Sequence, residues 1–203
     1  TGAERRAYHQ NALSLLRRVV DDRACRRDHA AWFQLGWLAW KHAQRLHEAE
    51  EAFAQCARLT TVTRDLFYVE SLRHVAHIRY LRGNIVGAYR AIADALQVSL
   101  DPEVLFDGAR YAALTGRISE AQEWIAQCIQ RSPAVAISAL AEADFTALAR
   151  ELHELISRVL SQARYQARTM VTHWSDALDR IASWQEQSGH TVELPTYLGR
   201  SCA

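Results

Sequence analysis

Glycine and proline are scarce in this sequence, which has 8 Gly and 3 Pro in 203 residues. An all-β sandwich or barrel needs a turn roughly every 8–12 residues, so this scarcity excludes that class. Hydrophobic residues make up 49% and charged residues 23%, which is close to the average of globular proteins and excludes wholesale disorder. The length suits one large domain or two small ones.

A strong excess of one charge is also missing, because 24 Lys and Arg oppose 23 Asp and Glu and leave a net charge of +1. We therefore expect no nucleic-acid partner. No run of apolar residues approaches the roughly 18 that a transmembrane helix needs, so we expect no insertion into a membrane. The chain opens on Thr1 and its only methionine is Met170, and we interpret it as a piece of a longer protein.

Cysteine pairs with the spacing of a zinc site are absent. The four cysteines lie far apart, no Cys-x-x-Cys pair occurs, and no Cys/His cluster has zinc-ligand spacing. We expect reduced thiols in a cytoplasmic protein. The cysteines are Cys25, Cys56, Cys128 and Cys202.

Motifs of catalysis are absent as well. The sequence holds no phosphate-binding loop, no Gly-x-Ser-x-Gly and no His-Glu-x-x-His. His74 and His77 lie three residues apart and could share a metal ion, but no further ligand pattern completes a site, so we interpret them as surface or groove histidines. We expect a protein that is not an enzyme, with no catalytic residue, no metal ion and no cofactor.

Helical periodicity runs through most of the chain. Apolar residues recur at spacings of three and four, and Asp101-Pro102 places a helix-capping residue before a proline at the first helical position. A capping box is predicted at Ser119 and Gln122. The pattern predicts an all-α fold of paired helices joined by tight turns. The expected helices span residues 4–20, 29–40, 49–59, 66–81, 85–98, 101–114 and 119–131.

Three segments in the expected second helices of these pairs repeat one pattern. In residues 49–56, 88–95 and 121–128, a small residue is followed four positions later by a large apolar residue and three positions after that by another small one. The segments begin 39 and 33 residues apart, which brackets the tetratricopeptide period of about 34. Small residues let two helices approach closely, and large ones fill the space between neighbouring pairs.

The repeat over residues 29–133 resembles the tetratricopeptide repeat family. Trp32, Leu35 and Gly36 match its Trp-x-x-Leu-Gly opening, Gly83 and Gly116 match its glycine between helices, and Pro133 matches its repeat-ending proline. The resemblance implies a solenoid of about three helical hairpins. Two departures occur. The first turn has Gln44 where glycine is usual, and Ala39, Arg79 and Ala112 stand where the family prefers tyrosine.

The resemblance also implies a binding groove, because the first helix of each hairpin lines the concave face in this family. Trp, Tyr and Arg are enriched at binding hot spots, so we expect the groove to bind a peptide or helix of another protein. An alternative is that the chain's own N-terminal helix covers the tryptophans. The Lys/Asn set of a peptide-carboxylate clamp is absent. The implied groove residues are Phe33, Trp37, Trp40, Lys41, Glu70, Arg73, His77, Tyr80, Glu103, Phe106, Asp107 and Arg110.

Flanking segments surround the repeats: an N-terminal helix and charged loop over residues 1–28, a capping helix and a long helix over 134–188, and a tail over 189–203. Between Phe145 and Gln187 there is no Gly or Pro, and Asp144 is the expected N-cap. The helix either continues through its weak centre at residues 162–166 and projects, or bends there and folds back. A projecting seam would pair with a copy of itself or a partner helix through Met170, Trp174, Ile181 and Trp184.

These observations predict a non-enzymatic scaffold or adaptor that binds other proteins, with homodimerisation through the long helix as a further possibility. The alternative is a regulatory or recognition module of a larger enzyme or effector whose catalytic domain lies outside this chain.

Overall fold

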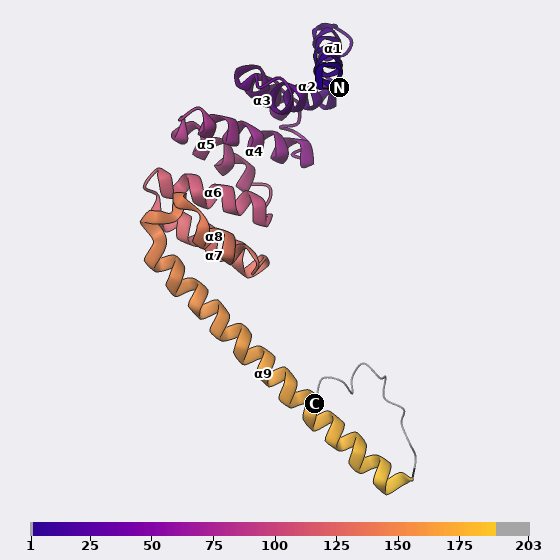
Figure 1. The fold of residues 1–203 in the computed structure, drawn as a ribbon, viewed down its shortest axis with the longest axis vertical. Coiled ribbons are helices and arrows are strands. Elements are labelled where there is room, and N and C mark those ends of the chain that lie inside the picture. The colour runs from indigo at the N-terminus through magenta and orange to yellow at the C-terminus, as the bar shows by residue number, and fades with distance from the viewer. Residues whose placement is uncertain (1, 190–203) are drawn as a thin grey trace. The chain divides into compact units, whose positions relative to one another are not determined.

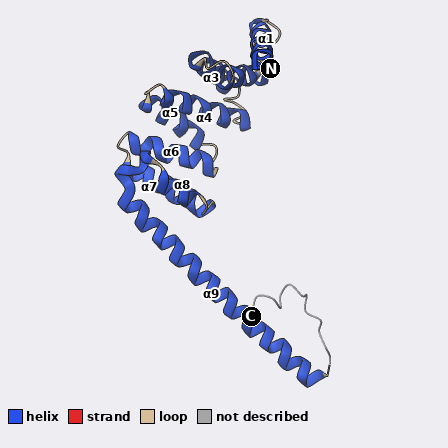
Figure 2. Cartoon of the chain, in the orientation of Figure 1, coloured by secondary structure: helices blue, strands red, loops and turns tan. Residues whose placement is uncertain are grey.

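The structure is a computed structural model that describes residues 2–189, and this part of the chain is helical without any strand (Figure 2). The expected all-α class is therefore confirmed for the described residues. The chain divides into two compact units, Thr1–Leu155 and Ile156–Ala203. Within residues 2–189, no helix combines the length and the apolar character that crossing a bilayer requires.

The first unit is a series of helices that pack in the order of the chain (Figure 1). Each of the helices α1 to α7 contacts the next, and α2 also contacts α4, which contacts α6. The first helices of three successive hairpins therefore lie side by side in one row. The helices are α1 (Gly2–Asp21), α2 (His29–Lys41), α3 (Leu46–Leu59), α4 (Leu66–Leu81), α5 (Ile85–Leu96), α6 (Pro102–Leu114), α7 (Ile118–Arg131) and α8 (Val135–Ala141).

The turns within the three hairpins share a left-handed residue. Gly83 and Gly116 have φ angles of 78° and 75°, and Gln44 has a φ of 54° at the corresponding turn. The backbone N–H groups of Asn84 and Arg117 each donate to the carbonyl five residues earlier, at 2.9 Å. Glycine adopts this conformation without steric cost, whereas Gln44 holds it with a Cβ close to the backbone.

The repeated small and large residues form the core between the hairpins. All of them are at most 2% exposed. A Cβ atom built on Gly36 would lie 2.9 Å from ring carbons of Phe53, so a glycine at this position allows α2 and α3 to approach closely. The repeated residues are Ala49, Phe53 and Cys56, then Ala88, Ile92 and Ala95, then Ala121, Ile125 and Cys128.

The expected capping box at the start of α7 is wrong. The helix begins at Ile118, its N-cap is Arg117, and no side chain caps it. Ser119 and Gln122 therefore lie inside the helix. The left-handed turn at Gly116 sets the N-cap of α7 two residues earlier than the side-chain pattern indicated.

The start of the long helix also differs from the expectation. A 3-10 helix, η1 (Ala143–Leu148), precedes α9 (Ala149–Ser188), and Asp144 lies within η1 instead of capping a helix. Phe145 and Leu148 are three residues apart, so one turn of 3-10 helix places both on the same side, where η1 contacts α6 and both are buried.

The long helix α9 itself is continuous through residues 162–166, so the alternative of a bend at this point is wrong. The helix ends at Ser188, immediately before Gly189, whose φ angle is 67°. The rest of the expected tail, residues 190–203, lies outside the described residues.

Candidate interaction surface

An aromatic cluster lies on the row formed by α2 and α4. We use this name for Phe33, Trp37, Trp40 and His74. The two tryptophan rings meet edge to face with centroids 5.7 Å apart. The His74 ring lies 5.7 Å from Phe33, 5.6 Å from Trp37 and 5.1 Å from Trp40. The imidazole is therefore the centre of the cluster, although the repeat pattern did not place His74 in the groove.

Part of the aromatic cluster remains open to solvent. The Trp37 side chain is 37% exposed, and Trp40 and Phe33 are half-buried. The Nζ atom of Lys41 lies 3.6 Å from the Trp40 ring centroid and 5.4 Å from that of Trp37. Such a cation–π contact at an exposed site contributes about 0.5–1 kcal/mol. The N-terminal helix thus leaves the edge of the cluster uncovered, with a positive charge beside it.

The aromatic contacts continue from α2 through α4 to α6. His77 lies 5.4 Å from Trp40 and 6.4 Å from Tyr80, and Tyr80 lies 5.4 Å from Tyr111. These are ring-centroid distances within the range of favourable aromatic contact. Trp40, His77 and Tyr80, which the repeat pattern places in the groove, therefore share one surface. Tyr111 is a buried residue beneath it.

Two arginines beside this surface are held by carboxylates, and we call this set the arginine network. Arg73 contacts Asp107 at 3.0 Å and also pairs with Glu103. Arg110 contacts Asp144 at 2.7 Å and Asp107 at 3.6 Å. Each guanidinium already has carboxylate partners, so neither is a free receptor for an anionic ligand.

Asp144 is the part of the arginine network that sequence reasoning missed. It lies 34 residues beyond Arg110, in η1. One of its carboxylate oxygens accepts from Arg110, and the other accepts a hydrogen bond from the Tyr80 hydroxyl at 3.2 Å. Arg110 also lies 5.1 Å from the centroid of the Tyr80 ring. The only available signal was an acidic pair, Glu142 and Asp144, just after the repeats.

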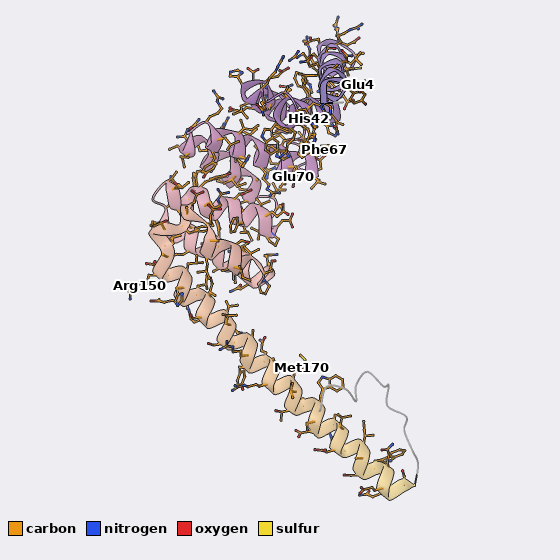
Figure 3. All side chains as sticks on the ribbon, viewed as in Figure 1. Glu4, His42, Phe67, Glu70, Arg150 and Met170 are labelled. Atoms are coloured by element: carbon orange, nitrogen blue, oxygen red, sulfur yellow. The ribbon has the colours of Figure 1, made fainter. Side chains whose placement is uncertain are left out.

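A pocket of about 660 Å³ opens beside the arginine network. Four carboxylates and one guanidinium line it, so the pocket is acidic. Figure 3 labels one of these residues, Glu70 on α4, and also Phe67, whose ring lies 5.4 Å from Phe33. The lining residues are Glu70, Arg73, Asp101, Pro102, Glu103, Val104, Phe106, Asp107, Ser132, Val135 and Ser138.

The titratable groups near the surface are kept neutral by burial. Burial, with the nearby charges of Arg73, His77 and Lys41, lowers the pKa of His74 to about 4, and burial also lowers the pKa of His77. Burial raises the pKa of Cys56, and it raises that of Cys128 to about 11, so both remain thiols at neutral pH. Among residues 2–189, no three His, Cys, Asp or Glu side chains gather as metal ligands.

Acid is expected to destabilise the first unit through His74. The unfolded chain binds a proton near pH 6.5, whereas the folded chain resists it until about pH 4, so stability falls as the pH drops through this window. The loss of stability from this group approaches about 3 kcal/mol.

Urea denaturation at pH 7.5 and pH 4.5 measures this loss. His74→Phe should reduce the pH dependence, while His153→Gln, at an exposed histidine, should preserve it; equal pH dependence in all three proteins would contradict the expectation.

The residues expected for self-association lie in the second unit, on α9. Met170, Trp174 and Trp184 are 62%, 61% and 49% exposed, and Ile181 is half-buried. They belong to a different helix from those that form the row of α2, α4 and α6. The structure thus presents two distinct candidate surfaces, one on each unit.

No protein-family model and no curated protein matches the sequence.

Proposed function

We propose that this chain is a tetratricopeptide-like, non-enzymatic scaffold that binds a peptide or helix of a partner protein on the row of α2, α4 and α6. The observation that carries the proposal is the exposed edge of Trp37, held by its contacts with Trp40 and His74. This aromatic surface is already formed and partly exposed to water in the free protein. A partner that covers its apolar area therefore gains binding free energy.

The resemblance to the tetratricopeptide family supports this use of the surface. The small residues of the repeated pattern are buried, and the left-handed turn recurs in each hairpin. Both features agree with a stacked-hairpin solenoid, in which the first helices form the ligand-binding face.

The chemistry around the aromatic cluster defines the class of peptide. An apolar or aromatic side chain would pack against Trp37, and an acidic side chain would pair with Lys41. The acidic pocket beside Glu70 and Glu103 favours a lysine or arginine further along the peptide. The proposed ligand therefore carries an apolar anchor, flanked by an acidic residue on the Lys41 side and a basic residue on the pocket side.

Loss of the two tryptophans is expected to abolish this binding. A library of displayed peptides, selected on the full chain, should enrich sequences with the stated pattern. Trp37→Ala/Trp40→Ala should weaken binding of a selected peptide by about 100-fold or more, because these rings supply the anchor contact. Isothermal titration measures the affinity, and far-UV circular dichroism checks the fold.

Tyr165→Ala is the matched control, because it removes a 71% exposed aromatic ring from the second unit. It should leave peptide affinity unchanged. Selection that enriches no common pattern, or peptide binding that survives the double substitution with the helical signal intact, would contradict the proposal.

A further inference from the structure

The second unit carries a regular heptad seam. From Ala163 onward, small or apolar residues recur at alternating spacings of four and three, which is the a/d pattern of a coiled coil. The a positions are Ala167, Trp174 and Ile181, and the d positions are Ala163, Met170, Ala177 and Trp184.

The middle of this seam is uncovered. Met170, labelled in Figure 3, is 62% exposed, and Trp174 is 61% exposed. Val171, at the flanking e position, is 68% exposed. Large apolar side chains in one continuous stripe favour contact with another surface over contact with water.

The same face contains a hollow lined by the four positions that receive a knob in a coiled coil. A hollow of about 520 Å³ is lined by Ala177, Arg180, Ile181 and Trp184. These residues stand at i, i+3, i+4 and i+7, which is the set of four that receives one knob from a facing helix. The hollow forms because Ala177 is small and its neighbours along the helix are large.

The order of large and small residues selects an antiparallel partner of the same sequence. In an antiparallel pair, an a residue of one helix packs at the level of a d residue of the other. A pair centred between residues 175 and 176 places Trp174 against Ala177 of the second copy, and Met170 against Ile181. It also places Trp184 against Ala167, so each tryptophan meets an alanine.

A parallel pair would not pack in this way. It would place Trp174 against Trp174 of the second copy and Ala177 against Ala177, so that one layer is overfilled and the next is empty. Both errors cost stability in a packed interface. Volume complementarity is therefore satisfied by the antiparallel arrangement and not by the parallel one.

We infer that α9 pairs with α9 of a second copy of this chain as an antiparallel coiled coil over residues 167–184. Met170 of each copy enters the hollow formed by Ala177, Arg180, Ile181 and Trp184 of the other. This inference is independent of peptide binding on the first unit.

Exchanging the large and small residues at positions 174 and 177, which face each other in the central layer, tests the antiparallel pairing. Sedimentation equilibrium of the full chain should show a dimer, and Trp174→Ala should raise its dissociation constant at least ~100-fold. Ala177→Trp should also weaken it, because two tryptophans then compete for one layer. The double variant Trp174→Ala/Ala177→Trp restores one large and one small residue per layer and should recover dimerisation relative to both single variants.

Tyr165→Ala is again the matched control, because Tyr165 is an exposed aromatic residue on the side of α9 away from the seam. It should leave the dissociation constant within about threefold of the original. A chain that stays monomeric at 23.0 kDa at all concentrations would overturn the inference. A double variant that dimerises no more tightly than the weaker of the two single variants would also overturn it.

Helix direction is measured with spin labels attached singly at Thr172 or Glu186, in a full chain carrying Cys25→Ser and Cys202→Ser. In the antiparallel register, the two labels of a dimer are offset along the axis by about 10 Å at residue 172 and about 31 Å at residue 186. Pulsed electron paramagnetic resonance should therefore give a clearly longer distance for the second site. Equal distances at the two sites would indicate a parallel pair and overturn the inference.

Discussion

Replacing Phe53 with alanine is expected to lower the free energy of unfolding of the first unit by about 3–5 kcal/mol. The ring is fully buried, faces Gly36 across the α2–α3 contact, and lies 5.3 Å from Phe33 and 4.6 Å from His74. Alanine would leave a cavity that neighbouring helices fill only in part, since the glycine opposite has no side chain to expand into it. Urea denaturation followed by circular dichroism, at one fixed protein concentration, measures the change.

Phe67→Ala is the control for this prediction. Phe67 also contacts Phe33, at 5.4 Å, but it is half-buried, so its removal leaves a site that water can enter. The loss should be clearly smaller than for Phe53. If both substitutions cost the same, the close α2–α3 packing around Gly36 would not be the source of the stability.

Helix positions were predictable where local chemistry sets both ends. The helix expected at 66–81 matches α4, whose N-cap Asp65 accepts a hydrogen bond from the Tyr68 N–H at 3.2 Å and which is followed by the turn at Gly83. The segment at 143–148 was not predictable in the same way. Its 3-10 conformation depends on burying Phe145 and Leu148 near α6, and that contact joins residues far apart in sequence.

The candidate surface could be predicted only in part. Aligning the repeats placed Trp37, Trp40 and His77 on one face, and the ring contacts show that they do lie together. The same alignment missed His74, because a histidine in a helix carries no mark of the rings that will surround it. It also missed Asp144, which reaches Arg110 through the path of η1 and not through any repeat position.

The two tryptophan surfaces differ in the kind of partner that their geometry suits. Around Trp37, the neighbours are His74 and Lys41, so this surface is both charged and aromatic. Around Trp174, the order of large and small apolar residues in the seam is complementary to itself in the antiparallel register. A protein with both surfaces could present two ligand sites per dimer, which raises the apparent affinity for a partner with repeated motifs.

Removing Arg110 is expected to cost about 3 kcal/mol of stability in the first unit. Its side chain is 13% exposed and that of Asp144 is 12% exposed, so Arg110→Ala takes from Asp144 the arginine that pairs with it at 2.7 Å. Asp107 loses a more distant contact with Arg110 but keeps Arg73. Loss of one partner from a buried ion pair costs about 3–5 kcal/mol, and partial hydration of this site places the expectation at the lower end. Urea denaturation measures the change.

The same network should show strong coupling between Arg110 and Asp144. Arg110→Leu/Asp144→Leu removes both charges and should recover much of the stability lost in Arg110→Leu alone, because no unpaired carboxylate remains at position 144. The control is Arg150→Ala, which breaks the Arg150–Glu154 pair with side chains that are 87% and 59% exposed. Solvent screens that pair, so unfolding should be unchanged within error. A loss in Arg110→Ala no greater than in Arg150→Ala would show that the carboxylates tolerate its absence and that η1 is held on α6 by Phe145 and Leu148 alone.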